Sequence, residues 1–109
     1  MMTKERSTNV VIGQEFLEKQ LKSIGFSKVE FEGSDGDALY LVAVGDKSGI
    51  FIKAKVLSPN SRVTEFTTKD EEDVIKRAIA KHLEPWTVIV VLNNQKLLNS
   101  IKWRDLSKS

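Results

Sequence analysis

Two lysines stand at alternate positions in a short apolar segment near the middle of the chain. Lys53 and Lys55 lie within residues 50–57, where apolar and polar side chains alternate. Because alternate residues of a strand point to the same face, both ammonium groups are expected on one side of a sheet. Such a pair can bind phosphate, or it can form a solvated face that discourages edge pairing. Phe51 and Leu57 share that face, which favours a partly covered position.

Acidic side chains that could act with these lysines occur earlier in the chain. Asp37 follows Gly36 just before the apolar run 39–44, and Glu15 lies in a segment with helical periodicity. Asp37 can equally be a turn residue, and Glu15 can equally belong to a solvated helix surface. The acidic run 70–73 precedes an apolar helical stripe, so we interpret it as complementing a positive helix N-terminus.

The composition excludes several classes of function. The 109 residues include 17 basic and 15 acidic side chains, one histidine and no cysteine. A net charge of +2 is too small to indicate a nucleic-acid or membrane partner by itself. The absence of cysteine excludes thiolate chemistry and favours a reducing, cytoplasmic location. The longest apolar run, residues 86–92, is far shorter than the roughly 20 residues of a membrane-spanning helix, so we expect no membrane partner.

The side chains named above must be positioned by helices and strands that the apolar periodicity predicts. The expected elements are a helix over 12–24, strands over 28–32, 39–44 and 50–57, a helix beginning near Thr68, and a strand over 86–92. Thr68 and Glu71 have the spacing of a capping box. Residues 96–106 fit either a short helix or an edge strand.

This order predicts one α/β domain with a central mixed sheet flanked by helices, in the order α-β-β-β-α-β. The domain is expected over residues 12–109, after a flexible tail at residues 1–11. Strands joined by short turns suggest a meander, and a crossover helix brings the fourth strand into the same sheet.

Four pieces of the chain, spread over residues 12–92, carry a resemblance to a known family. They are Gly13–Leu17 running to Gly25-Phe26, Gly36–Leu39, Ile52–Val56, and the second helix leading into Trp86–Val91. The order and spacing resemble the PD-(D/E)XK nuclease superfamily, and within it the Holliday junction resolvases. The resemblance implies a restriction endonuclease-like fold and a magnesium-dependent DNA endonuclease, a hydrolase of phosphodiester bonds.

The family's motif transfers only in part to this sequence. Asp37 matches the first metal-binding acid, and Lys55 matches the motif lysine, so the resemblance makes these two the catalytic residues. Lys53 stands where the second acid is expected, and an ammonium group cannot bind magnesium. Gln14 stands where resolvases place a helix glutamate, which leaves Glu15, one position later, as a substitute metal ligand. Lys53 is then interpreted as a phosphate contact.

Two classes of function follow. The first is a divergent nuclease-fold protein that binds or acts on DNA, with an impaired magnesium site formed by Asp37 and Glu15. If that site is active, the protein is a magnesium-dependent DNA endonuclease. The second is a non-catalytic interaction or assembly module. Its natural form is a homodimer through the apolar C-terminal segment, which contains Leu97, Leu98, Ile101 and Trp103.

Overall fold

The computed structural model describes residues 8–35, 38–58 and 65–108. Two α-helices and five strands follow one another, and a short 3₁₀ helix, Leu106–Lys108, closes the described chain. The elements are α1 (Thr8–Ser23), β1 (Lys28–Asp35), β2 (Ala38–Val44), β3 (Gly49–Leu57), α2 (Thr68–Ala80), β4 (Glu84–Leu92) and β5 (Leu98–Asp105). The first six elements occur in the predicted order, and the ambiguous segment 96–106 supplies a fifth strand.

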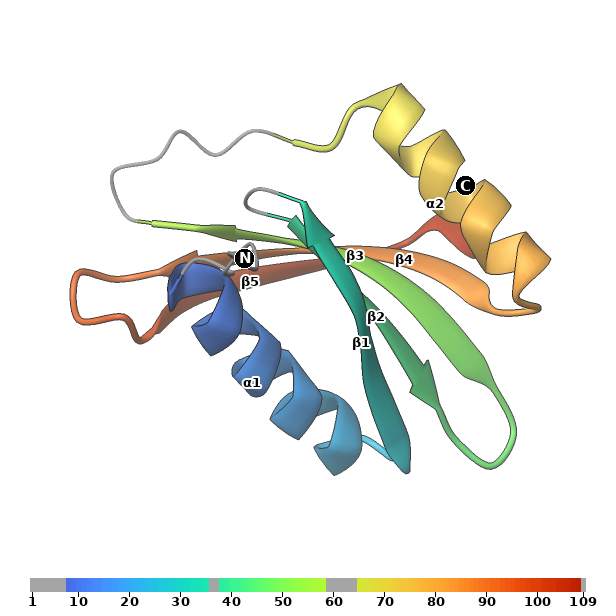
Figure 1. The fold of residues 1–109 in the computed structure, drawn as a ribbon, viewed down its shortest axis with the longest axis horizontal. Helices are drawn as coiled ribbons and strands as arrows, with labels where there is room; N and C mark the ends of the chain where they lie inside the picture. The colour runs from blue at the N-terminus through green and yellow to red at the C-terminus, as the bar shows by residue number, and fades with distance from the viewer. Residues whose placement is uncertain (1–7, 36–37, 59–64, 109) are drawn as a thin grey trace, which may run out of the picture.

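The strands form one mixed sheet in the order β1-β2-β3-β4-β5. Neighbouring strands are antiparallel except β3 and β4, which are parallel because α2 carries the chain back across the sheet. The two helices lie on opposite sides of the sheet, α1 below it and α2 above it in Figure 1. The predicted α/β architecture, a central mixed sheet flanked by helices, is therefore confirmed.

Alternation along β3 divides the core between these two helices. Ile52, Ala54 and Val56 are buried with Leu17 and Leu21 of α1. Phe51, on the other face of β3, is fully buried with Val74 and Ala78 of α2. The period of two predicted for this strand thus places its lysines on the face that α2 covers.

The first helix begins earlier than its periodicity predicts. It starts at Thr8 rather than near Ile12, so residues 8–11 are helical and the expected tail over 1–11 is too long. Val10 is fully buried in the core on the α1 side of the sheet. Val10 lies seven residues before Leu17, so it extends the same buried face of the helix toward the N-terminus. Residues 1–7 lie outside the described part of the chain.

The second helix starts where it was expected, but its cap is shifted by one residue. Thr67 is the N-cap, its hydroxyl accepts from the Asp70 backbone N–H, and the Asp70 carboxylate accepts from the Thr67 backbone N–H. The predicted pairing of Thr68 with Glu71 is wrong. Glu71 instead pairs with Arg104 of β5 at 2.8 Å. Neither α1 nor α2 is long and apolar enough to cross a membrane.

Candidate functional site

The two lysines that the sequence singles out lie side by side along the central strand. Lys53 and Lys55 occupy the α2-facing side of β3, and both are partly buried. On the same face lie Tyr40, which is paired with Lys53 across the β2–β3 ladder, and Phe66, which precedes α2. The expected sharing of one partly covered face is confirmed.

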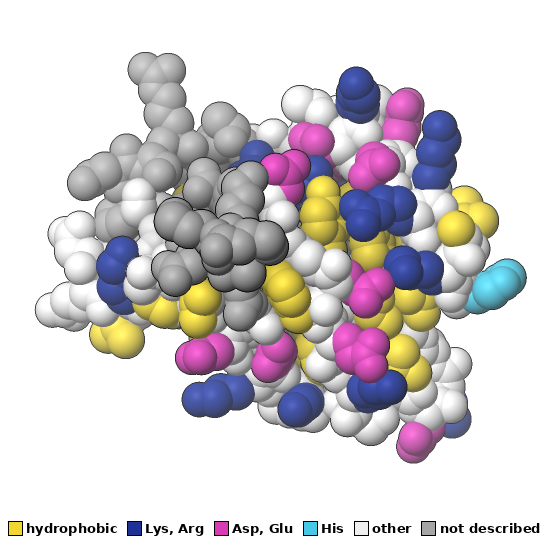
Figure 2. Space-filling model, in the orientation of Figure 1, with side chains coloured by type: hydrophobic (Ala, Val, Ile, Leu, Met, Phe, Trp, Pro, Cys, Tyr) yellow, Lys and Arg dark blue, Asp and Glu magenta, His cyan; other side chains and the backbone are white. Residues whose placement is uncertain are grey.

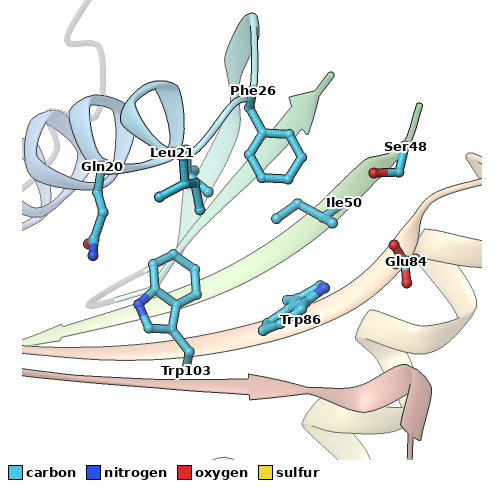
Figure 3. A pocket seen from close by; sticks show the side chains of 9 residues that line it. Gln20, Leu21, Phe26, Ser48, Ile50, Glu84, Trp86 and Trp103 are labelled. Carbon is cyan, nitrogen blue, oxygen red and sulfur yellow. The ribbon is translucent and has the colours of Figure 1, made fainter. Parts of the chain in front are cut away.

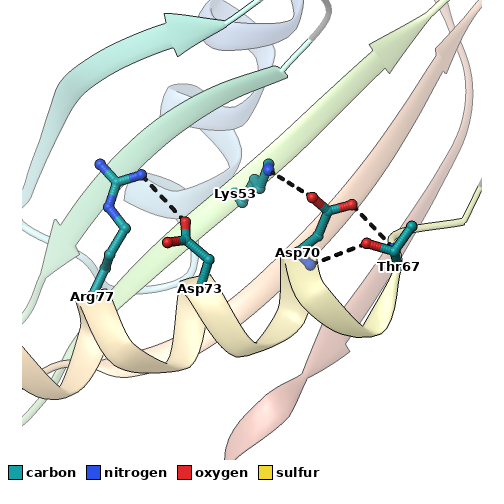
Figure 4. A network of polar contacts seen from close by, with 5 residues as sticks. All are labelled: Lys53, Thr67, Asp70, Asp73 and Arg77. Atoms are coloured by element: carbon teal, nitrogen blue, oxygen red, sulfur yellow. Dashed lines mark hydrogen bonds and ion pairs between the residues drawn. The ribbon is translucent and has the colours of Figure 1, made fainter.

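Lys53 is held by groups of the protein itself. Its Nζ lies 3.3 Å from Asp70 Oδ1, and only 13% of its side chain is exposed (Figure 4). The same ammonium group is 5.5 Å from the ring centroid of Tyr40 and 5.9 Å from that of Phe66. Lys53 therefore anchors α2 to the sheet, and its charge is satisfied without any ligand.

Asp70 serves the helix cap and the lysine together. Its Oδ2 accepts from the Thr67 backbone N–H at 3.0 Å, while Oδ1 accepts from Lys53. The hydrogen bond from Thr67, followed by the nearby Lys53 ammonium, lowers the pKa of Asp70 in spite of partial burial. Burial acts to lower the pKa of Lys53, but the Tyr40 hydroxyl and the Asp70 carboxylate outweigh it, so this pKa is raised. Both shifts favour the charged pair at neutral pH.

Further cations lie against aromatic rings on this face. Lys55 Nζ is 4.8 Å from the centroid of Phe66. The Arg77 guanidinium lies 4.2 Å from the centroid of Tyr40, and Tyr40 is itself stacked on Phe51 with 6.0 Å between centroids. We call Tyr40, Lys53, Lys55, Phe66 and Arg77 the basic–aromatic surface. Its members come from β2, β3, α2 and the segment before α2.

The sequence does not show that Tyr40 and Phe66 lie beside these cations, because the aromatic and basic residues are not interleaved along the chain. Tyr40 and Lys53 become neighbours only through the register of the β2–β3 pair. Asp70 was interpreted as complementing the helix dipole, which it does, but its contact with Lys53 depends on how α2 packs on the sheet. Knowing the hairpin register would have been enough to place Tyr40 beside Lys53.

Acidic groups accompany many of the cations near this surface. Arg77 lies 3.7 Å from Asp73, an ion pair within α2. Arg104 pairs with Glu71, and Lys102 pairs with Glu65 at 2.8 Å. Figure 2 likewise shows Lys and Arg side chains interspersed with Asp and Glu on the face that it presents, rather than a single basic stripe.

Of the two predicted acidic residues, Glu15 lies apart from the lysines. Glu15 is exposed on α1, which packs on the opposite face of the sheet from Lys53 and Lys55. Gln14, at the position where resolvases carry glutamate, donates to Glu18 Oε1 at 2.9 Å along the same helix. Asp37 lies outside the described residues. Its neighbour in sequence, Ala38, pairs with Lys55 across the β2–β3 ladder.

The residues expected to bind magnesium are only partly described by the structure. Within residues 8–35, 38–58 and 65–108, no three His, Cys, Asp or Glu residues gather as metal ligands. Lys53 presents an ammonium group where the family resemblance calls for a carboxylate, and its partner Asp70 already accepts from both Lys53 and Thr67. A magnesium site remains a prediction that depends on Asp37.

Comparison with known proteins assigns no family. No protein-family model matches the chain, and no curated protein matches it.

Proposed function

We propose that this protein is a divergent nuclease-fold protein that binds DNA through the basic–aromatic surface, with an impaired capacity for magnesium-dependent cleavage. The observation that carries the proposal is the gathering of Lys53, Lys55 and Arg77 with two aromatic rings on one face of the sheet. Proteins that bind nucleic acids use cations to contact the phosphate backbone and aromatic rings to stack against the bases. The order of the first six elements supports the resemblance from which the proposal starts.

The three cations have different roles in this proposal. Lys53 is mostly covered and paired with Asp70, so it organises the surface rather than contacting phosphate. Arg77 is more exposed, and its 3.7 Å pair with Asp73 is at the surface. Exposed pairs contribute only about 0–1 kcal/mol, so a phosphate can displace Asp73. We therefore assign the phosphate contacts to Lys55 and Arg77. Lys53, which the sequence suggests as a phosphate contact, is not assigned that role in this proposal.

Impaired cleavage follows from the ammonium group of Lys53. A second carboxylate at this position would help to bind a magnesium ion, and the bound ion would activate water. Lys53 instead repels the ion, and it forms an ion pair with the Asp70 carboxylate. The proposal places the protein in the cytoplasm, in keeping with a chain that has no cysteine.

The binding test is fluorescence anisotropy with labelled linear duplex, branched duplex and single-stranded DNA at two salt concentrations. The Lys55→Ala/Arg77→Ala double variant should bind at least about tenfold more weakly. Loss of two phosphate contacts should also make the slope of log affinity against log salt shallower by about 2 units. The matched control is Lys76→Ala, an exposed α2 cation outside the surface, which should bind like the parent protein.

Two results would contradict the proposal. The first is absence of binding to every DNA at low salt. The second is equal binding by the double variant and the Lys76→Ala control. The cleavage part has its own test, which follows nicking of supercoiled DNA with magnesium or manganese. Robust nicking that Asp37→Ala abolishes would show an intact metal centre and overturn the impaired-site interpretation.

A homodimer is a second candidate, favoured by exposed leucines beside an open sheet edge. β5 is at one end of the strand order. Leu98 at its start is 37% exposed, and Leu97 just before it is 59% exposed. They border a hollow of about 210 Å³ with Ile12 and Phe16 of α1. Ile101 and Trp103, expected in the same interface, instead pack against the protein's own core. We therefore propose that any dimer contact is confined to the leucines.

Light scattering on the full chain tests this second candidate. A dimer mass that falls to a monomer mass in Leu97→Lys/Leu98→Lys is the expected result, because the two ammonium groups would be buried in the contact. Ile79→Lys on α2, at a side chain that is 66% exposed, is the control and should keep the dimer. A monomer mass for the parent protein rules the dimer out. Truncation before β5 is unsuitable, since it removes a strand of the sheet.

A further inference from the structure

A hollow of about 320 Å³ lies on the face of the sheet opposite the basic–aromatic surface. It is bounded by the C-terminal part of α1, by Phe26 in the segment that follows, and by side chains of β3, β4 and β5 (Figure 3). Its volume is at the lower end of the range for small-molecule sites, about 300–1,000 Å³. Nothing in the DNA-binding proposal uses it.

The walls of the hollow are aromatic. Trp86 of β4 and Trp103 of β5 meet with ring centroids 6.3 Å apart and ring planes at 80°. An edge-to-face pair leaves a right-angled corner that is bounded by one face of each ring. Phe26 projects toward the same space from the other side, above Ile50 (Figure 3). Three π systems thus surround one apolar volume.

Among the described residues that line the hollow, the one charged side chain is an acid. Glu84, the first residue of β4, places its carboxylate at one end, and the described lining contains no Lys or Arg. Gln20 adds an acceptor, because its Oε1 is buried with no hydrogen-bond partner in the described structure. Trp86 Nε1 is likewise buried without a partner, so a polar atom on a ligand would satisfy it.

These features select among ligand chemistries. An anion is disfavoured by the Glu84 carboxylate, which no described lining cation offsets. A hydrated metal ion is disfavoured by walls that offer few oxygen ligands. A neutral apolar molecule would bury its surface but would gain nothing from Glu84 or from the negative faces of the indole rings. An alkylated ammonium group gains from the apolar walls, from the Glu84 carboxylate and from the negative faces of the indole rings. Its charge is spread over methyl groups that pack like hydrocarbon.

We propose that this hollow is a binding site for a small quaternary ammonium compound. The cation lies in the corner between Trp86 and Trp103, with Glu84 as its counter-ion. A hydroxyl carried on a short arm can donate to Gln20 Oε1 or accept from Trp86 Nε1–H. The site is independent of the basic–aromatic surface, since the two lie on opposite faces of the sheet.

The chain offers a direct spectroscopic readout of this site. It contains two tryptophans, and both line the hollow. Titration with choline should therefore give a saturable change in tryptophan fluorescence. The neutral carbon isostere of choline, 3,3-dimethylbutan-1-ol, has the same shape without the charge and should bind about tenfold more weakly, because cation–π attraction is worth about 0.5–2 kcal/mol. Equal binding of the two compounds would overturn the proposal.

Two variants test the residues that the proposal names, with binding measured by calorimetry so that tryptophan can be removed. Trp103→Leu should weaken choline binding by about tenfold while leaving the isostere nearly unaffected. Glu84→Gln should weaken choline binding about threefold, with a loss that shrinks as salt rises. Glu72→Gln on α2, an exposed acid far from the hollow, is the control for net charge.

Circular dichroism identifies any variant that does not fold. Glu84 is exposed, so Glu84→Gln should fold and keeps the proposal testable even where Trp103→Leu does not. Equal choline affinities for Glu84→Gln and Glu72→Gln would contradict the counter-ion role and overturn the proposal. Absence of any saturable signal with the parent protein would do so as well. DNA binding should be unchanged in Glu84→Gln, so failure of one proposal is distinguishable from failure of the other.

Discussion

At the scale of single residues, the neighbours of Lys53 decide what its ammonium group does. The position would hold a metal-binding acid if the family motif were complete, and a lysine there could bind phosphate instead. In the folded protein the Asp70 carboxylate lies 3.3 Å away and most of the lysine side chain is covered. This partly buried ion pair helps to position α2 on the sheet and contributes to stability. Removing one partner leaves the charge of the other without a counter-charge.

Asp70→Asn should destabilise the protein by about 1 kcal/mol at pH 7, after allowance for partial exposure of this pair. The loss should depend on pH. Because the pKa of Asp70 is lowered in the folded state, its contribution is fully present above the unfolded pKa and is lost as pH falls through the folded pKa. Denaturation by urea from pH 7 down to pH 2 should therefore show the parent and variant stabilities converging in acid.

At alkaline pH, the contribution of Lys53 to stability changes with pH in the opposite direction. The pKa of Lys53 is raised, so its contribution is complete below the unfolded pKa and disappears as pH rises through the folded pKa. Asp73→Asn serves as the control, because the Asp73 pair with Arg77 is more exposed and longer, at 3.7 Å. That variant should change stability by no more than about 0.5 kcal/mol. A constant difference between the parent protein and Asp70→Asn from pH 7 to pH 2 would contradict the role assigned to Asp70.

At the scale of elements, close approach between α1 and β3 sets how the first helix sits on the sheet. Gly13 is buried in the middle of α1, facing Val56 of β3. A Cβ atom at this position would lie 2.5 Å from Val56 Cγ2, a distance that forces something to move. The glycine is thus needed for packing, although it costs helix propensity of up to about 1 kcal/mol relative to alanine.

Gly13→Ala should lower the free energy of unfolding by about 1–3 kcal/mol, since overpacking outweighs the gain in helix propensity. In a Val56→Ala background the clashing methyl group is gone, so the same substitution should be neutral or stabilising. Chemical denaturation of the two single variants and the double variant measures this coupling. Lys19→Ala, at an exposed α1 position, controls for helix propensity alone. Additive effects of Gly13→Ala and Val56→Ala would show that the clash is absent.

At the scale of the whole molecule, the sheet separates two surfaces of different chemistry. The basic–aromatic surface lies on the α2 side of the sheet, and the tryptophan-lined hollow lies on the α1 side. The net charge is only +2, and many of the individual charges form local ion pairs. Such pairs include those of Lys53, Arg77, Lys102 and Arg104. DNA affinity must therefore come from a few displaceable pairs, and should be modest and sensitive to salt.

Local periodicity was a good guide to the elements and a poor one to their ends. The apolar stripe of α2 could be recognised because one side of that helix faces a core, and the period of two in β3 because its alternate residues face two different cores. The start of α1 is expected too late because Thr8 and Asn9 are polar, although Val10 continues the helix face of Leu17 and Leu21. The cap of α2 was misplaced by one residue, because two threonines have acids three positions later and only tertiary contacts distinguish them.

The sequence by itself determined the α/β class, the order of the first six elements, and the sharing of one strand face by Lys53 and Lys55. These depend on spacing along the chain, which backbone geometry converts directly into faces of helices and strands. Only the tertiary structure decided that Asp70 holds Lys53, that Tyr40 and Phe66 join the lysines, and that Trp86 and Trp103 meet at a right angle. Such contacts depend on strand register and helix docking between residues distant in the chain, and no local pattern encodes them.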